Sequence, residues 1–429
     1  MDLTVTKHSS RSDDILLLVG QTLSQVSDRM VQLGLIWFIT SGFGERFLIW
    51  YLVIGGLPHL LLVKHSGYII QKISSLRTVL YSDLARGCVY LLAFALISIF
   101  PQWLSEKNHS AILWLLFISV FASNIFSAFF NPAILSLSVE IKESDEVQKL
   151  TAKLSSINSF ATILGPIIGL YIFNAFNLNG LFIIASISYL LSAYALSMVS
   201  KAIPNIKKTS ITDSTSDSGY LHIFKSHKII GVMLSVFLII NLMLSPIQIL
   251  MPSMAKDLFG NSFNSLAIME TFLGVGILIG GAILSVFSIK KHTLFWTWLF
   301  LVIMSFAFSA FTYSGQIDLN DITVLGQAMK INFVMSAMCL LILGFTLGMA
   351  NILILNILQT QPKATDVPTV MSFVNLIGTA TLPFSLATLG ILQQYFSVAH
   401  LGQISGTILV LFVILSYLPF RQYGQEIFK

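Results

Sequence analysis

The sequence predicts an all-α membrane protein with twelve transmembrane helices in two pseudo-symmetric six-helix bundles. Composition, a series of apolar runs and one central polar tract support this prediction. Of the 429 residues, 55% are hydrophobic and 10% are charged, whereas a soluble domain carries about 25% charged residues. So few charges cannot cover the apolar surface of a water-soluble protein of this size, and lipid is the expected solvent.

Twelve apolar runs have about the 17–25 residues that a helix needs to cross the hydrocarbon core. They cover 15–40, 47–66, 79–100, 111–138, 154–174, 180–200, 229–254, 265–289, 293–314, 332–358, 368–394 and 403–420. The first run follows a segment with Asp2, Asp13 and Asp14 and no small-residue cleavage site. We therefore interpret it as a retained span and not as a signal peptide.

A polar tract at 201–228 separates the sixth run from the seventh. It holds five lysines and a series of Ser, Thr and Asp residues, a composition that cannot build a core and predicts a flexible linker. The expected organisation is an N-terminal six-helix bundle at 1–200, a cytoplasmic linker at 201–228 and a C-terminal six-helix bundle at 229–429.

The basic residues predict the orientation. Of the 24 Lys and Arg residues, 18 fall on the linker side of the spans, 4 on the other side, and Arg29 and Arg86 lie within spans. Because cytoplasmic loops carry the excess of Lys and Arg, the linker and both termini are expected in the cytoplasm. The net charge of +5 therefore indicates orientation, and its dispersed residues form no stripe that would bind nucleic acid.

Several function classes lack their motifs. There is no Gly-Lys-Ser/Thr phosphate loop, no HExxH and no sequence similar to a potassium filter, so we expect neither an enzyme nor a channel, and no cofactor or metal. Cys88 and Cys339 are expected as buried small residues. Gly276 and Gly280, four residues apart, favour a helix contact over a nucleotide loop.

The first run carries a polar face. Gln21, Gln25, Asp28 and Gln32 are spaced by 4, 3 and 4 residues, which places them on one side of a helix. Ionisable groups at membrane depth indicate function, so this face is expected to line a wet cavity. Asp28 is then the candidate for proton coupling. The candidate substrate-binding residues of this span are Gln25, Arg29 and Gln32.

Two interpretations of Asp28 remain open. A desolvated, protonatable carboxylate would couple transport to a proton gradient, whereas a carboxylate paired with an arginine would be a fixed part of the site. Adjacent helical residues point about 100° apart, which favours Arg86 over Arg29 as the partner.

Other spans show similar but weaker features. The seventh span carries Asn241, Ser245 and Gln248, and the tenth carries Gly344, Gly348 and Asn351. These seams fit either close helix packing or a cavity between two related bundles; Asn241, Gln248 and Asn351 are the further candidate substrate contacts. Glu270 in the eighth span is either a second coupling residue or a snorkelling surface group.

Four motifs resemble the major facilitator superfamily, and within it the bacterial efflux branch that includes macrolide and enterobactin exporters. The motifs are Gly20-Gln21-x2-Ser24-x3-Asp28 in the first span, Asp83-Leu-Ala-Arg86 in the third, Phe129-Phe130-Asn131-Pro132-Ala133 at the end of the fourth, and Gly165-Pro166-x2-Gly169, which is similar to the antiporter motif of the fifth span. The loop Gly67-x3-Gln71-Lys72-x4-Arg77 departs from the family pattern, because Gln71 replaces the usual gating carboxylate. The resemblance implies gating or structural roles for Gly67, Lys72, Arg77, Asp83, Arg86, Gly165, Pro166 and Gly169.

The resemblance implies a secondary active transporter of the bacterial inner membrane, with proton-coupled efflux of an amphipathic small molecule by alternating access. Its partners would be a small-molecule substrate, protons or another coupling ion, and the bilayer, and we expect a monomer. A siderophore and a macrolide-like drug are both candidate cargoes. The alternatives are a lysophospholipid flippase, a nutrient or siderophore importer, and a transport-dead membrane scaffold or sensor.

Overall fold

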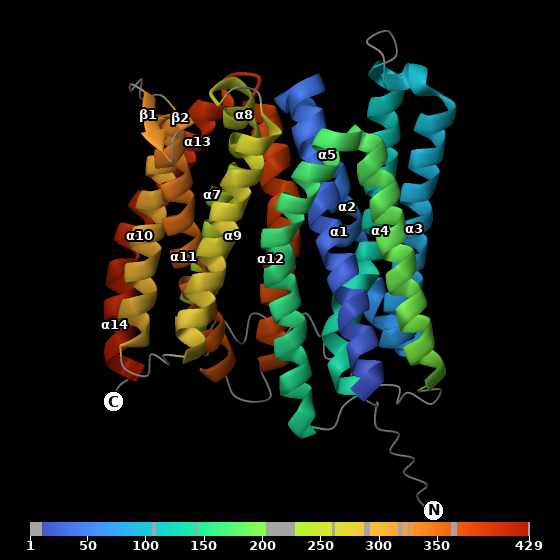
Figure 1. The fold of residues 1–429 in the computed structure, drawn as a ribbon. Helices are drawn as coiled ribbons and strands as arrows, with labels where there is room; N and C mark the ends of the chain where they lie inside the picture. Colours follow the sequence, from blue (N-terminus) through green and yellow to red (C-terminus); the bar gives the residue numbers. More distant parts are fainter. Residues whose placement is uncertain are drawn as a thin grey trace, which may run out of the picture. The chain divides into compact units, whose positions relative to one another are not determined.

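The computed structural model describes residues 11–104, 109–141, 144–202, 228–259, 262–286, 292–315, 321–324, 327–361 and 367–427. Almost all of them are helical (Figure 1). The elements are α1 (Arg11–Phe43), α2 (Glu45–Ile73), α3 (Ser75–Ile99), η1 (Pro101–Leu104), α4 (His109–Ile141), α5 (Ser144–Ala202), α7 (Lys228–Leu244), α8 (Ile247–Asp257), α9 (Phe263–Val286), α10 (Thr293–Ser314), β1 (Asp321–Val324), β2 (Gln327–Lys330), α11 (Ile331–Thr360), α12 (Val367–Leu392), α13 (Val398–Leu415) and α14 (Tyr417–Ile427).

Most of each predicted apolar run is helical, and residues 287–289 of the eighth run lie outside the described residues. The fifth and sixth runs both fall in α5, where Asn177 interrupts the helix with a φ of 53° and a ψ of −147°. Among the described residues, nine helical segments are long and apolar enough to cross a membrane. These segments overlap every run except 15–40 and 368–394. The run 368–394 includes the shorter apolar helix Leu376–Leu392. The polar face of α1 lowers the hydropathy of the first run.

By its internal contacts the chain divides into two compact units. Unit 1 contains Met1–Ile39 and Ile54–Thr212, and unit 2 contains Thr40–Val53 and Asp213–Lys429. Residues 203–227 of the predicted linker lie outside the described residues.

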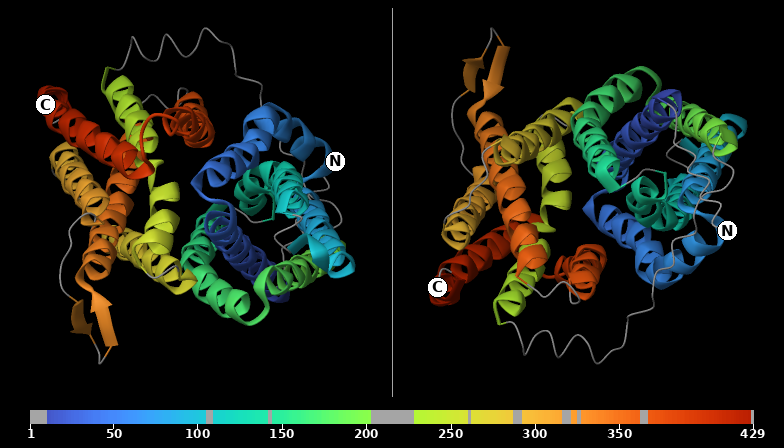
Figure 2. Two further views of the ribbon diagram at one scale, coloured as in Figure 1. Left: turned by 90° about the horizontal axis from the view of Figure 1, so that it is seen from above. Right: turned by 90° about the horizontal axis from the view of Figure 1, so that it is seen from below.

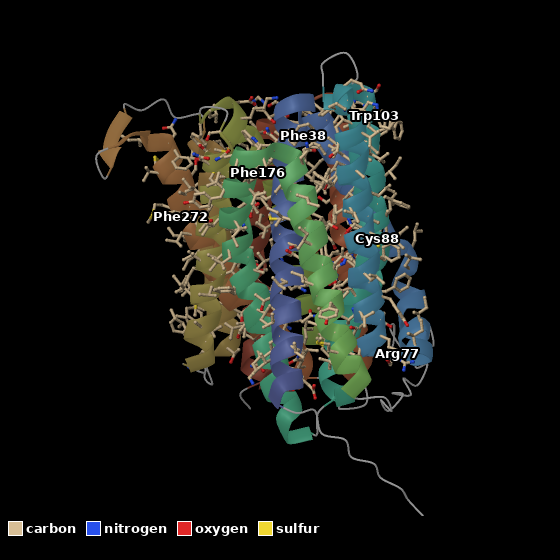
Figure 3. The ribbon with its side chains drawn as sticks, turned by 45° about the vertical axis from the view of Figure 1, so that its right-hand side comes forward. Phe38, Arg77, Cys88, Trp103, Phe176 and Phe272 are labelled. Atoms are coloured by element: carbon tan, nitrogen blue, oxygen red, sulfur yellow. The ribbon has the colours of Figure 1, made fainter. Side chains whose placement is uncertain are left out.

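Unit 1 is built on α3, which packs against both α4 and α5. Residues of α1, α3, α4 and α5 pack together in its apolar core. This core includes Leu17, Leu76, Val79, Phe130 and Leu196, whose side chains have no exposed surface. The side chains in Figure 3 place Arg77, in the first turn of α3, and Trp103, in η1, at opposite ends of this unit. Between these ends α3 buries the face that carries Asp83 and Arg86.

The opposite face of α3 corrects one prediction. Cys88 (labelled in Figure 3), which we expected to be buried, is exposed. Cys339 on α11 is only partly buried. Leu84, Leu91 and Leu92 are also exposed on α3. In a membrane-spanning helix an apolar or small side chain need not turn inward, because lipid solvates it as well as protein does.

Unit 2 centres on α11, which packs against α9 and α10. Glycines bring α9 and α11 together: a Cβ on Gly276 would lie 2.3 Å from the Leu341 carbonyl oxygen, and one on Gly344 would lie 2.2 Å from that of Leu273. The antiparallel strands β1 and β2 pair Asp321 with Lys330 and project beyond the helices of this unit (Figure 2).

Unit 2 also includes Thr40–Val53, the end of α1 and the start of α2. The Lys256 Nζ of α8 donates to the Thr40 carbonyl at 2.9 Å, and the Gln393 Nε2 donates to the Glu45 Oε2 at 3.3 Å. A Cβ on Gly390 of α12 would lie 2.9 Å from Ile49. The tip of the α1–α2 hairpin therefore packs with the helices that lie more than 200 residues later in the chain.

Candidate functional site

The charged residues of unit 1 converge from α1 and α3. Asp83 and Arg86 are three residues apart and share the buried face of α3. Ser24 and Asp28 are four residues apart and share one face of α1. The two faces meet, and together these four side chains form what we call the unit 1 cluster.

Arg86 is the hub of this cluster. Its Nη1 donates to both oxygens of Asp28, at 2.9 Å to Oδ1 and 2.8 Å to Oδ2. Its Nη2 donates to the Ser24 Oγ at 3.1 Å and also to the Asp83 carboxylate. The Ser24 hydroxyl in turn donates to the Asp83 Oδ1 at 2.9 Å. The guanidinium thus bridges two carboxylates on two helices.

Aromatic rings and α5 complete the surroundings. The guanidinium carbon lies 4.3 Å from the ring centroid of Phe130 and 4.6 Å from that of Tyr189, both within the range of a cation–π contact. The Tyr189 hydroxyl donates to Asp28, and the Ser192 hydroxyl donates to the Asp83 Oδ2 at 2.6 Å. Four helices therefore hold the one arginine.

The exposure of the cluster is uneven. The side chains of Arg86 and Asp83 have no exposed surface, whereas that of Asp28 is 33% exposed. Along α1, Gln21 is buried, Gln25 is half-buried and Gln32 is exposed. The polar face is therefore closed near Gln21 and opens towards Gln32, and Asp28 is the charged group of the cluster that a solute can reach.

Small residues bring α5 close to this face. A Cβ on Gly165 would lie 2.3 Å from the Arg29 Cβ, and one on Gly169 would lie 3.3 Å from the Met30 carbonyl oxygen. Pro166, inside α5, is buried beside them. The Gly165-Pro166-x2-Gly169 motif thus packs directly against the turn of α1 that carries Asp28 and Arg29.

Unit 2 holds a cavity of about 390 Å³. The candidate residues Asn241 from α7, Gln248 from α8 and Asn351 from α11 all line it. The remaining lining residues are Phe237, Ile240, Leu244, Ser245, Ile247, Ile277, Leu301, Met304, Leu347, Gly348, Ala350, Ile354, Gly378 and Leu382. The wall is thus apolar with a few amide and hydroxyl groups, and none of its residues is ionisable.

The remaining candidates lie on α1, α2, α3 and α9. Arg29 is half-buried against α5, and Glu270 is half-buried on α9. Arg77 is exposed in the first turn of α3. Gly67 and Lys72 belong to α2, but their side-chain surroundings lie outside what the structure describes.

Sequence reasoning did not single out the partners that α5 supplies. Tyr189 and Ser192 lie in apolar runs where nothing distinguishes them from packing residues. Phe130 stood within the fourth-span motif, but nothing in the sequence marked it as a partner of Arg86. Ser24 stood within the first motif and lies four residues before Asp28. That spacing was the one available signal, since it places a hydroxyl on the same helical face as the carboxylate.

Comparison with known proteins identifies the family. The family model described as Major Facilitator Superfamily matches residues 17–388. The chain belongs to the Major Facilitator Superfamily. As a member of this superfamily it is a multi-pass integral membrane transporter.

Relatives in this superfamily include Macrolide efflux protein A of Streptococcus pyogenes, which is 20% identical over 404 residues, covering 92% of this chain and 93% of the relative. Macrolide efflux protein A of Enterococcus faecalis is 21% identical over 183 residues, which are 41% of this chain and 55% of the relative.

Solved structures share the fold. A bacterial homologue of the iron transporter ferroportin in an inward-facing state has a TM-score of 0.70 at 13% identity, covering 95% of this chain and 99% of its own. The POT family transporter PepTSo has a TM-score of 0.69 at 12% identity, covering 97% and 99%. The protein therefore has the all-α, twelve-helix fold of the Major Facilitator Superfamily.

Proposed function

We propose that the protein exports an amphipathic, macrolide-like small molecule in exchange for protons, as a monomer in a bacterial inner membrane with both termini in the cytoplasm. The observation that carries the proposal is the Asp28 carboxylate, which is one-third exposed in a cluster whose other charged members are fully buried. The carboxylate is in an ion pair with Arg86 and accepts a hydrogen bond from Tyr189, which corresponds to the second interpretation of Asp28 above. Its exposed part is accessible to a cationic cargo or to a proton that displaces the pair.

The unit 2 cavity supports an amphipathic cargo. Its wall is mostly aliphatic, with Asn241, Gln248 and Asn351 offering amide groups. Binding sites of this composition bury an apolar ligand and orient it through a few hydrogen bonds. A strongly anionic siderophore would leave its carboxylates without a cation in this wall, so we favour the macrolide-like cargo over the siderophore.

The relatives point the same way. Macrolide efflux protein A of Streptococcus pyogenes matches this chain over nearly its whole length, although at 20% identity. At this low sequence identity, we propose that the two proteins share a class of cargo. A macrolide-like cargo is consistent with export as the direction of transport and with the neutral, mainly apolar wall of the unit 2 cavity.

Transport of radiolabelled erythromycin by the purified full-length protein in liposomes tests this function. An imposed pH gradient should drive accumulation, and dissipating it with a protonophore should return uptake to the level of protein-free liposomes. Asp28→Asn should reduce gradient-driven accumulation by about tenfold or more, because it removes the exposed charge of the cluster.

Asp257→Asn, the same change at an exposed carboxylate of α8, is the matched control and should transport normally. A wild-type protein that moves no erythromycin under either direction of the gradient would contradict the proposed cargo. Unchanged transport by Asp28→Asn would remove this residue from the coupling mechanism.

A further inference from the structure

A second cavity of unit 2, of about 460 Å³, lies between its first helix and its last helices. It shares no lining residue with the unit 2 cavity described above. The helices α7 and α13 are neighbours in this unit (Figure 2). Because Lys228 and Ser235 are exposed, the cavity is open to the surface, and we call it the α7–α13 groove. Its lining residues are Lys228, Gly231, Val232, Ser235, Val236, Phe412, Leu415, Ser416 and Pro419.

The groove lies where two membrane spans end. Lys228 is the first residue of the span Lys228–Asp257, and Pro419 is in the last turn of the span Val398–Gln422. Both residues line the groove. The ends of spans lie at the level of the lipid headgroups, because the hydrocarbon core sets the length of the helices. The groove therefore begins at the headgroup level and continues along α7 into the hydrocarbon region.

An aromatic pair marks the same level. The ring centroids of Trp298 in α10 and Tyr417 in α14 are 4.9 Å apart, and Trp and Tyr are enriched where the membrane meets water. The Trp298 Nε1 donates to the Val413 carbonyl at 2.9 Å, and Val413 has no exposed surface. Thus α10 covers one face of α13, whereas Phe412 and Leu415 line the groove.

The charge and polarity of the groove are uneven along its length. Lys228 is the one ionisable group of the lining, and it pairs with no carboxylate of the described residues. The Ser235 hydroxyl donates to the Gly231 carbonyl at 2.8 Å, and the Ser416 hydroxyl donates to the Val413 carbonyl at 2.7 Å. Both serines therefore direct their protons to their own backbone, and the rest of the wall is apolar.

We propose that the α7–α13 groove binds one anionic phospholipid, with its phosphate against Lys228 and an acyl chain along Val232, Val236 and Phe412. A cation at the headgroup level above an apolar wall is complementary to an anionic headgroup that carries a hydrocarbon chain. The inference does not depend on the cargo. Phe237, which follows Val236 on α7, lines the unit 2 cavity, so the lipid and the proposed cargo bind on either side of the same helix.

Native mass spectrometry of the full-length protein in detergent tests this site, with dioleoyl phosphatidylglycerol and dioleoyl phosphatidylcholine added at equal concentration. The wild type should retain one phosphatidylglycerol molecule in preference to phosphatidylcholine. Lys228→Gln should weaken this retention about fivefold, which is the contribution of one lysine to binding an anionic headgroup. Lys153→Gln, the same change at an exposed lysine of α5, should retain the lipid as the wild type does.

The acyl chain is tested by filling the groove. Ser235→Trp should abolish the preferential retention of phosphatidylglycerol, because the indole ring occupies the space of the chain. Thr388→Trp, at an exposed residue of α12, is the control for bulk and should retain the lipid. Inorganic phosphate in excess should not displace the lipid from the wild type, because phosphate has no chain to bury.

Several outcomes would overturn the proposal. Equal retention of the two lipids, or equal weakening in Lys228→Gln and Lys153→Gln, would show that Lys228 recognises no headgroup. Displacement by inorganic phosphate would indicate a simple anion site. Displacement by erythromycin would assign the groove to cargo, and a dimer that Ser235→Trp abolishes would assign it to a second copy of the chain.

Thermal unfolding provides a second measurement that needs no transport. Phosphatidylglycerol should raise the unfolding midpoint of the wild type and of Lys153→Gln more than phosphatidylcholine does, because a ligand that binds the folded state stabilises it. In Lys228→Gln the two lipids should have similar effects. The same advantage of phosphatidylglycerol in all three proteins would reject the site at Lys228.

Discussion

The polar groups of unit 1 and unit 2 are organised in opposite ways. In unit 1 they are charged, they come from several helices, and Arg86 and Asp83 have no exposed surface. In unit 2 the polar groups that line the cavity are neutral, and Asn241 bonds locally, its Nδ2 donating to the Phe237 carbonyl at 2.8 Å. A network of ions resists change because each member depends on the others, whereas a wall with few amides tolerates substitution.

The difference suggests a division of labour within the proposed transport cycle. In the proposed cycle, charge and protons would be handled by α1, α3 and α5 of unit 1, and the shape and hydrogen bonds of the cargo by the helices of unit 2. If this division holds, substitutions in unit 1 should change stability and coupling strongly, while those in the unit 2 cavity should change cargo affinity with smaller effects on folding.

The largest effect is expected at Arg86. Arg86→Leu would leave Asp28 and Asp83 facing each other without their cation, and removing one partner of a buried ionic network costs about 3–5 kcal/mol. We expect a steep fall in the unfolding midpoint and in membrane yield, measured by thermal unfolding in detergent. Arg77→Leu, at an exposed arginine of the same helix, is the control, and equal losses in the two variants would contradict the central role of Arg86.

The second effect concerns packing within unit 2. A Cβ on Gly280 would lie 2.2 Å from the Phe345 carbonyl oxygen, whereas one on the adjacent Gly281 would meet only Ile352 at 3.8 Å. Because backbone cannot yield as a side chain does, Gly280→Ala should lose about 1–3 kcal/mol of stability. Gly281→Ala should be nearly neutral. Thermal unfolding of the pair measures the difference, and indistinguishable midpoints would mean that α9 and α11 do not approach this closely.

The spans and part of the unit 1 cluster could be predicted from the sequence, whereas the partners from other helices could not. The apolar runs identify the spans because hydrocarbon requires a minimum helix length, and the spacing of Asp83 and Arg86 places them on one face. The partners that α5 supplies were not visible: Tyr189 and Ser192 lie among apolar residues, and only their hydrogen bonds to Asp28 and Asp83 select them. Phe130 stood within a motif, but its contact with Arg86 was not visible either. Likewise, nothing in the sequence indicates that Thr40–Val53 packs with unit 2.

A moderate effect is expected in the unit 2 cavity. Asn351→Leu removes one of the amides that line the wall, and the loss of one hydrogen bond to a neutral group, worth about 1 kcal/mol, should raise the KM for erythromycin exchange about fivefold. Asn356→Leu, one and a half turns further along α11 and exposed, should not change it. A large loss of folding stability in Asn351→Leu would show that this amide serves packing and not binding.

The smallest effect tests the boundary between the two units. Lys256→Met removes the donor to the Thr40 carbonyl, which is bonded at 2.9 Å, and such a contact is worth about 1 kcal/mol. Amide hydrogen exchange in Thr40–Val53 should therefore accelerate about fivefold, while exchange in α3 should not change. Lys153→Met, at an exposed lysine of α5, should alter neither segment. If the exchange of Thr40–Val53 followed α3 in every variant, this hairpin tip would belong energetically to unit 1, and contacts with α8 would not hold it.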